Sequence, residues 1–167
     1  MKKLLLHCCC APCASHVLDI LRSEYDITVL FYNPNIVPKE ERDKRRAELT
    51  RLIGIFNEEK EKNKIEMLEH DGEDVAMQKN DCAACISHRL QVTSDLANKH
   101  NFDLFTTTLT ISPHKNAKLI NEIGVALSPK YLPADFKKQD GFKKSVELSK
   151  KYSIYRQNYC GCEPSLM

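Results

Sequence analysis

The sequence predicts an α/β domain in which one parallel sheet carries helices on both faces. Short apolar or β-branched runs alternate along the chain with longer amphipathic segments. Such alternation is typical of strand–helix–strand units, whose strands pair in parallel. The 167 residues contain no repeat, linker or low-complexity stretch and match one domain in size. We therefore expect a single Rossmann-like domain over residues 1–167.

Four short segments are predicted to be strands. Residues 3–7 form an apolar run, and residues 27–32 are β-branched and aromatic. Residues 65–68 give a weaker third strand, and residues 102–108 give a fourth. Residues 131–132 are a candidate for a last, very short strand.

Five longer segments are predicted to be helices. In the second of them the apolar residues recur at i, i+3, i+4 and i+7, which gives one buried stripe: Leu49, Leu52, Ile53 and Phe56. Pro12 suits the first turn of the first helix. The five segments are residues 12 to about 25, 38 through 56, 82 to about 98, 119–127 and 142–152.

Cysteine spacing is the feature with the clearest chemistry. The eight cysteines fall into three clusters: HCCCAPC at 7–13, CAAC at 82–85 and CGC at 160–162. Thiolates are soft donors that bind iron–sulfur clusters, zinc or copper(I). Two sulfurs separated by two residues can reach one ion through a tight turn. Three such clusters far apart in sequence predict one metal site assembled by the fold.

Two other interpretations of the cysteines need to be weighed. A disulfide scaffold is typical of short secreted domains, and three consecutive cysteines suit it poorly. Structural zinc is the stronger alternative, because CxxC pairs build four-ligand zinc sites. Seven cysteines remain even when Cys8 is set aside, and four ligands suffice for zinc. The surplus favours an iron–sulfur cluster with a second metal beside it.

Polar residues follow three of the predicted strands. His7 and the first cysteines end the first strand, Asn33 follows the second, and Thr106 to Thr108 end the fourth. In open parallel sheets, ligands bind beyond the carboxyl ends of the strands. We therefore expect these polar segments to converge on one edge of the sheet and to form a single active site.

Composition restricts the class of protein. A hydrophobic content of 42%, a charged content of 29% and a net charge of +2 are those of an ordinary globular protein. No apolar run approaches the ~20 residues of a membrane span, so we expect no membrane partner. The apolar run before the first cysteines is too short for a signal peptide. We expect reduced thiols and a cytoplasmic location.

An ordered set of motifs extends across nearly the whole chain. It comprises LHCCCAPC at 6–13, FYNPNI at 31–36, Cys82 and Cys85 followed by Arg89-Leu90, FTTTL at 105–109 with Ser112-Pro113, Ile123-Gly124, Leu148-Ser149 and YRQNYCGC at 155–162. In this set the chain resembles the cobalamin-independent epoxyqueuosine reductases of the QueH type. The stretch between Ile53 and Gln78 departs most from the family pattern.

The resemblance implies an enzyme of queuosine biosynthesis and tRNA modification. Members of the family remove the epoxide oxygen of epoxyqueuosine at the tRNA wobble position, which gives queuosine. The implied cofactors are a 4Fe–4S cluster and a nearby mononuclear metal, expected to be iron, with no cobalamin. The implied partners are tRNA carrying epoxyqueuosine and a low-potential electron donor of the ferredoxin or flavodoxin type.

The resemblance also implies the metal ligands. The position of Cys8 varies in the family, so this thiol is expected to be a spare. Cys13 occupies a position that can carry other ligands, which makes it the expected ligand of the mononuclear metal. The full expected set is Cys9, Cys10, Cys13, Cys82, Cys85, Cys160 and Cys162.

Catalytic and substrate-binding candidates are less distinctive than the cysteines. The catalytic candidates are Cys13, as the expected metal ligand, and His7 and Tyr32, as candidates for proton transfer. A histidine at a strand end is more often a satisfied structural group. Aromatic and guanidinium side chains stack on single-stranded bases. The substrate-binding candidates are Asn33, Asn35, Tyr155, Arg156 and Gln157. The alternatives are that the Asn-Pro-Asn turn binds its own backbone and that a tyrosine only packs the last helix.

Two other function classes remain to be tested. A tRNA sulfur-transferase or nucleotide-activating enzyme would need a glycine- or serine-rich phosphate loop after the first strand. The loop of residues 8–13 contains no glycine, which argues against ATP. A zinc-binding RNA module without catalytic activity is the second rival. Such a protein is colourless, whereas an iron–sulfur protein is brown.

Overall fold

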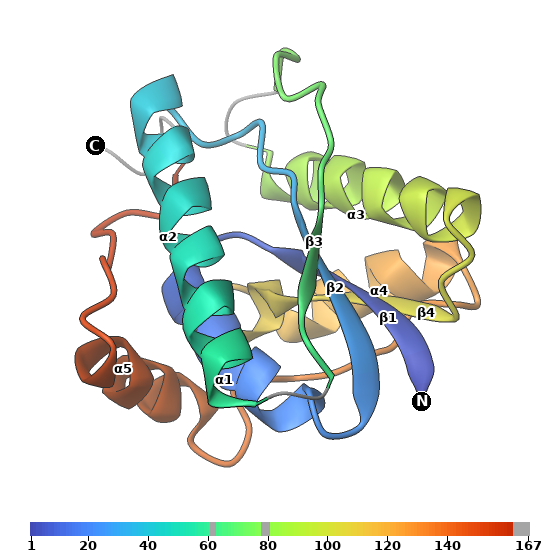
Figure 1. The fold of residues 1–167 in the computed structure, drawn as a ribbon. Coiled ribbons are helices and arrows are strands. Elements are labelled where there is room, and N and C mark those ends of the chain that lie inside the picture. Colours follow the sequence, from blue (N-terminus) through green and yellow to red (C-terminus); the bar gives the residue numbers. More distant parts are fainter. Residues whose placement is uncertain (61–62, 78–80, 162–167) are drawn as a thin grey trace.

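The fold is the predicted α/β arrangement around one parallel sheet (Figure 1). The computed structural model describes residues 1–60, 63–77 and 81–161. Its four strands are β1 (Lys2–Cys8), β2 (Tyr25–Phe31), β3 (Glu66–Leu68) and β4 (Leu104–Thr107). They pair in parallel in the order β3-β2-β1-β4.

Helices cover both faces of the sheet, as predicted. The helices are α1 (Ala11–Leu21), α2 (Lys39–Glu59), α3 (Cys82–Lys99), α4 (Ala117–Leu127) and α5 (Gly141–Lys151), with a short 3-10 helix, η1, at Thr108–Ile111. Helices α1, α2 and α5 pack on one face, and α3 and α4 pack on the other (Figure 1). Within the described residues, no helix is long and apolar enough to cross a membrane.

Side-chain alternation along the strands divides the core between the two faces. Leu4 and Leu6 of β1 pack against α1 and α2, whereas Leu5 between them packs against α3. The apolar stripe of α2 is buried as predicted, with Leu49 and Leu52 fully inaccessible to solvent. Each such leucine contributes roughly 1.5–3 kcal/mol through burial of apolar surface. These contacts fix the strand ends that carry the polar residues.

The structure corrects the bounds of three predicted elements. The first helix ends at Leu21 rather than near residue 25, because Tyr25 pairs with Lys2 and begins β2. The fourth strand is shorter than predicted, since the chain turns into η1 at Thr108. Residues 131–132 do not form a strand; Tyr131 makes one isolated parallel bridge to Phe105.

Strand order places a topological switch point at β1. The chain passes from β1 to β2 on one side, and β4 lies on the other side of β1. Connections leave in opposite directions at such a point, so the loops that follow the strands separate and leave room for a ligand. Cys9 and Thr108 follow β1 and β4 here, with 3.9 Å between Sγ and Oγ1. The predicted convergence of the strand ends is therefore confirmed.

Candidate metal centre

Three cysteine thiols lie together where β1 leads into α1. The sulfur atoms of Cys9, Cys10 and Cys13 all lie within 4.8 Å of one another. Cys10 is the N-cap residue of α1, and Cys13 is in its first turn. The unpaired amide groups of a helix N-terminus favour negative charge, so this position stabilises thiolates. The described part of the chain contains no other such group of three potential ligands.

The spacing of the sulfurs fits a metal. The Sγ atoms of Cys9 and Cys10 are 3.8 Å apart. Thiolates bind zinc or iron at ~2.3 Å, and two of them on one tetrahedral ion are roughly 3.8 Å apart. The three side chains are also buried or half-buried, which shields a bound centre from water. The thiols of this triad can therefore hold a metal ion or one face of a cluster.

The three thiols shift one another's pKa values. Hydrogen bonds with the thiols of Cys10 and Cys13 hold the pKa of Cys9 well below its usual range. The Cys13 thiol lowers the pKa of Cys10, but the bond to Cys9 and burial outweigh it and raise that pKa to about 12. Bonds to Cys10 and Cys9, with burial, raise the pKa of Cys13 well above its usual range. Metal binding needs deprotonated thiolates, so it would release protons from these thiols.

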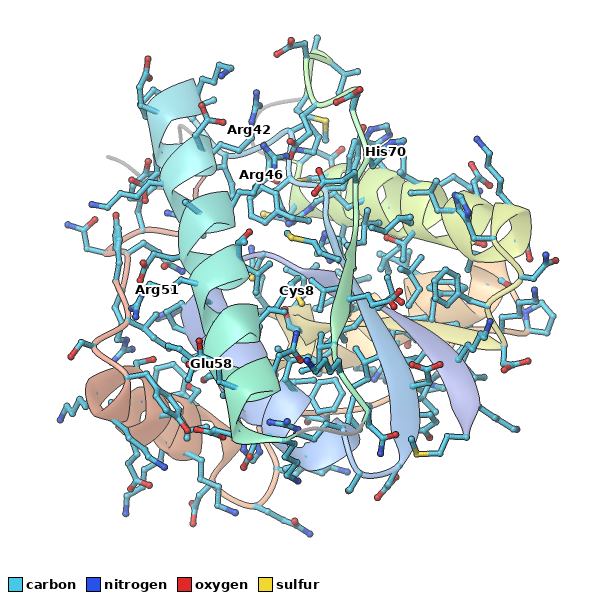
Figure 2. The ribbon with its side chains drawn as sticks, in the orientation of Figure 1. Cys8, Arg42, Arg46, Arg51, Glu58 and His70 are labelled. Carbon is cyan, nitrogen blue, oxygen red and sulfur yellow. The ribbon has the colours of Figure 1, made fainter. Side chains whose placement is uncertain are left out.

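Cys8 faces away from this group. It is the last residue of β1, and its side chain is buried in the apolar core under α1 and α2 (Figure 2). Its thiol donates to the carbonyl oxygen of Leu6 at 3.7 Å. Burial raises the pKa of the Cys8 thiol well above its usual range. The alternation of β1 therefore separates Cys8 from the neighbouring Cys9.

The other predicted ligands do not join the triad in this structure. Cys82 begins α3 and is exposed, Cys85 lies in its first turn and is half-buried, and Cys160 is exposed. Cys162 lies outside the described residues. No disulfide joins two of the described cysteines, so a disulfide scaffold does not form among them. The prediction that these four cysteines bind metal stays a prediction.

A buried arginine holds the third cysteine cluster against the body of the protein. Arg45 of α2 donates to the carbonyl oxygens of Cys160 and Tyr159, both at 2.9 Å, and pairs with Glu41 at 2.9 Å. The carbonyl oxygen of Gly161 accepts from the amide of Val37 at 2.8 Å. The chain around Cys160 is therefore fixed to α2 and to the loop after β2.

His7 is a fully buried residue with both ring nitrogens engaged. Its Nε2 lies 3.0 Å from the carbonyl oxygen of Tyr32, which can only accept, so Nε2 carries the proton. The hydroxyl of Thr107 lies 2.9 Å from Nδ1 and donates to it. Burial, followed by the charge of Arg89, lowers the pKa of His7 to about 4. His7 is therefore neutral at pH 7 and ties β1 to the ends of β2 and β4.

Tyr32 carries a phenol that is bonded to a second histidine. Its hydroxyl lies 2.8 Å from Nε2 of His88 on α3, and it also approaches the carbonyl oxygen of Gly72 at 3.4 Å. The rings of His70 and His88 pack against the tyrosine ring at 5.4 and 5.6 Å. Burial raises the pKa of Tyr32, so the phenol keeps its proton at neutral pH.

Asn33 connects three segments of the site. Its side-chain amide donates to the carbonyl oxygen of Cys8 at 2.9 Å, and its Oδ1 accepts from Arg89 at 3.1 Å. Its backbone amide donates to the carboxylate of Glu73 at 2.7 Å. Asn33 is fully buried, and both polar atoms of its side chain bind protein groups. Substrate binding by Asn33 stays a prediction.

The remaining predicted substrate contacts lie on two segments. Oδ1 of Asn35 is buried, with no hydrogen-bond partner among the described residues. The hydroxyl of Tyr155 donates to Glu41 at 2.7 Å, and Lys44 lies 3.7 Å above its ring. Arg156 is exposed, with its guanidinium 5.9 Å from the Phe142 ring, and Gln157 is partly exposed. Substrate binding by these four residues stays a prediction.

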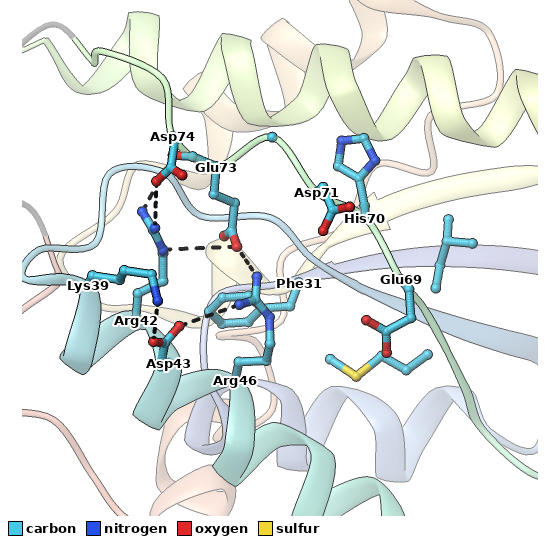
Figure 3. A pocket seen from close by; sticks show the side chains of 13 residues that line it. Phe31, Lys39, Arg42, Asp43, Arg46, Glu69, His70, Asp71, Glu73 and Asp74 are labelled. Atoms are coloured by element: carbon cyan, nitrogen blue, oxygen red, sulfur yellow. Dashed lines mark hydrogen bonds and ion pairs between the residues drawn. The ribbon is translucent and has the colours of Figure 1, made fainter.

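A polar pocket of about 400 Å³ opens beyond the ends of β2 and β3 (Figure 3). Arg42 and Arg46 of α2 reach into it toward the segment after β3, where His70 also lies (Figure 2). Ion pairs join Arg42 to Asp74 and Arg46 to Glu73 across the pocket wall (Figure 3). Residues 67–74, which line one side of the pocket, belong to the stretch between Ile53 and Gln78 that we expect to depart most from the family pattern. These ion pairs fix the loop whose Glu73 carboxylate binds Asn33.

The comparisons with known proteins agree with this geometry. The family model described as epoxyqueuosine reductase QueH matches residues 4–167. The chain belongs to the epoxyqueuosine reductase QueH family. This confirms the resemblance seen in the sequence, and with it the expectation of an oxidoreductase.

Three relatives named epoxyqueuosine reductase QueH show the extent of the similarity. The relative from Streptococcus pyogenes serotype M1 is 41% identical over 95% of this chain and 68% of its own length. The relative from Staphylococcus epidermidis is 38% identical over 96% of this chain and 74% of its own length. The Thermotoga maritima relative is 35% identical over all of this chain and 92% of its own length.

Sequence reasoning did not single out several polar residues of the QueH site. Glu73, Arg45 and His88 contact predicted site residues, yet each is a common surface type in sequence. Their partners lie 40 to 115 residues away, so no local spacing could reveal them. Arg89 could have been identified as a site residue from the sequence, because it belongs to the motif that follows Cys82 and Cys85.

Proposed function

We propose that this protein reduces epoxyqueuosine to queuosine at the wobble position of tRNA, using a 4Fe–4S cluster and a mononuclear iron. The observation that carries the proposal is the thiol triad of Cys9, Cys10 and Cys13 at the switch point of a QueH-family fold. A loop built from cysteines and proline has no phosphate cradle, which supports metal chemistry over nucleotide activation at this place.

Converting the epoxide to an alkene requires two electrons and two protons and releases one water molecule. When bound, the cluster and the mononuclear metal supply the electrons singly and polarise the C–O bond. The protein must therefore hold these groups, exclude bulk water and deliver protons. Cobalamin has no part in this proposal.

We propose a division of the thiols between the two metal groups. The four thiolate ligands of the cluster come from among Cys9, Cys10, Cys82, Cys85, Cys160 and Cys162, and Cys13 binds the mononuclear iron. The donor set fits, because soft thiolates are the ligands that iron–sulfur clusters require. The position of Cys13 in the first turn of α1, beside the other two thiols, supports a separate ion adjacent to the cluster.

Of the two predicted proton donors, we favour Tyr32. His7 keeps its only ring proton in a bond to a backbone carbonyl, whereas the Tyr32 hydroxyl can be resupplied by His88 at 2.8 Å. Tyr32→Phe should slow reduction by about 10²- to 10⁴-fold, because it removes the donor and keeps the ring. Single-turnover assays at matched iron content measure this effect. Unchanged turnover would assign the proton to water.

The proposed substrate is the folded anticodon loop rather than a free nucleoside. Arg156 and Gln157 are accessible beside the segment that carries Cys160, and guanidinium planes stack well on unpaired bases. Asn35, with its unpaired acceptor, could receive a hydrogen bond from the modified base. A ferredoxin- or flavodoxin-type protein is the proposed electron donor, since the reaction consumes two electrons at low potential.

Nucleoside analysis of treated tRNA tests the proposal. We expect anaerobic, iron-loaded protein with dithionite to convert epoxyqueuosine in tRNA to a product lighter by one oxygen, without cobalamin and without any effect of ATP. A product that has gained sulfur would identify a sulfur-transferase. A colourless zinc protein that only binds tRNA would identify the RNA-binding module. Unchanged epoxyqueuosine with a loaded cluster and a competent reductant would falsify the proposal.

The variant Cys13→Ala separates the two metal groups. We expect it to keep the visible absorbance and sulfide content of the cluster while it loses one iron per chain and the reductase activity. The physical reason is that an alanine offers no ligand to the separate ion. If Cys13→Ala also lost the cluster, Cys13 would be a cluster ligand, and the division of thiols proposed above would be wrong.

A further inference from the structure

Arg89 is a buried cation without a matching carboxylate. It lies one helical turn after Cys85 on α3, and only 2% of it is exposed. Its Nη1 donates to Oδ1 of Asn33, but its Nε has no hydrogen-bond partner among the described residues. No Asp or Glu of residues 1–60, 63–77 and 81–161 forms an ion pair with it. A buried charge of this kind is costly unless an anion compensates it.

Other buried arginines of the protein show how such charges are normally stabilised. Arg42 and Arg45 pair with carboxylates. Arg22 has no carboxylate, but it caps the C-terminus of α1 and donates to the carbonyl oxygen of Phe56 near the end of α2. It also lies 5.2 Å from the Phe56 ring centroid. Helix C-termini and aromatic faces both favour a cation.

Arg89 has neither of these forms of stabilisation. It lies in the interior of α3, away from a helix C-terminus, and none of the described aromatic rings lies beneath its guanidinium. The group that it does bind, the Asn33 side chain, donates in turn to the carbonyl oxygen of Cys8 beside the triad. Through these hydrogen bonds, Arg89 is linked to the backbone that carries the triad.

Arg89 lies on the side of the molecule that carries the triad. Through the Asn33 side chain it is joined to the carbonyl oxygen of Cys8, the residue directly before Cys9. It also lies on the same helix as Cys85, another predicted ligand of the cluster.

We propose that Arg89 is the fixed counter-charge of the centre bound by Cys9 and Cys10, and that it raises the reduction potential of that centre. The proposal rests on the function proposed above, because it needs an anionic thiolate-ligated cluster at this place. A cluster with thiolate ligands becomes more negative when it accepts an electron. A cation nearby in a medium of low dielectric stabilises the reduced form more than the oxidised form. Arg89 would thus act as a positioning residue for charge and would not touch the substrate.

Three variants test the role of Arg89. Arg89→Gln removes the charge and keeps an amide that can reach Asn33, whereas Arg89→Lys keeps the charge. Arg22→Gln is the matched control for the loss of a buried arginine. Stepwise anaerobic reduction followed by visible absorbance gives the midpoint potential of each. For Arg89→Gln we expect at least a tenfold lower ratio of reduced to oxidised cluster at a given potential. For a one-electron couple this is a fall of 59 mV. Arg89→Lys should recover most of this fall in midpoint potential. Arg22→Gln should lower the free energy of unfolding and leave the potential unchanged.

Each outcome decides the matter. An unchanged potential in loaded Arg89→Gln overturns the proposal, even if the protein reduces epoxyqueuosine. A lowered potential in a protein that loads a cluster but does not reduce epoxyqueuosine supports the charge role and rejects the proposed function. If Arg89→Gln fails to load a cluster, loading of Arg89→Lys supports the role of charge. If both variants fail to load a cluster, loading requires the shape of arginine and not its charge, which overturns the proposal. A wild-type protein without a cluster overturns both proposals.

Discussion

Replacing Cys10 by serine should abolish the visible absorbance, the bound sulfide and the reductase activity, whereas Cys8→Val should leave all three intact. Cys10 belongs to the thiol triad, and a hydroxyl is a hard donor that binds iron–sulfur clusters poorly. Cys8 lies on the opposite face of β1, in an apolar core where valine has a similar volume. Volume-conserving changes of this kind cost less than ~1.5 kcal/mol.

Anaerobic purification of the two variants, with iron and sulfide quantified per chain, measures this effect. Wild-type protein prepared in the same way sets the reference, and urea unfolding of the metal-free proteins shows that both variants fold. If Cys8→Val lost the cluster, the assignment of ligands within residues 8–13 would be wrong. If Cys10→Ser kept it, the triad would not be a metal centre.

The fold could be predicted because its determinants are local. The short continuous run of leucines in β1 and the apolar stripe of α2, with its period of 3.6 residues, are each visible within the segment itself. The errors lie where tertiary pairing decides the outcome. Tyr25 fits a helix or a strand, and its pairing with Lys2 draws it into β2. Residues 131–132 have strand-forming residue types, but only Tyr131 bridges Phe105.

The site could be predicted only in part, because some of its contacts are local in sequence and others depend on tertiary packing. Cys9, Cys10 and Cys13 are neighbours in sequence, and the first turn of α1 brings their thiols together. Joining them to Cys85 or Cys160 depends on how distant segments pack, which spacing does not specify. Asn33 illustrates this dependence, because its side chain binds Cys8 and Arg89, which lie 25 and 56 residues away in sequence. The chemistry of such a residue depends on partners that only the fold supplies.

Gly161→Ala should release the segment that carries Cys160. Gly161 has φ of +125°, a conformation that L side chains rarely adopt. A Cβ there would lie 2.7 Å from Cγ1 of Ile36 and 3.0 Å from Nη1 of Arg45. The strain costs on the order of 1–3 kcal/mol, and the clash adds to it. Because Arg45 also holds Cys160, we expect this variant to lose stability and at least part of its iron.

Gly54→Ala is the matched control, since the same change there has the opposite physical consequence. Gly54 lies in the interior of α2, and a Cβ would meet nothing within 4 Å. Alanine in a helix interior is favoured over glycine by roughly 0.5–1 kcal/mol, so this variant should be slightly more stable than wild type and equally rich in iron. Urea unfolding and iron content measure both variants. Full iron content in Gly161→Ala would mean that the Cys160 segment does not bind the centre, because a ligand cannot be displaced without loss of its metal.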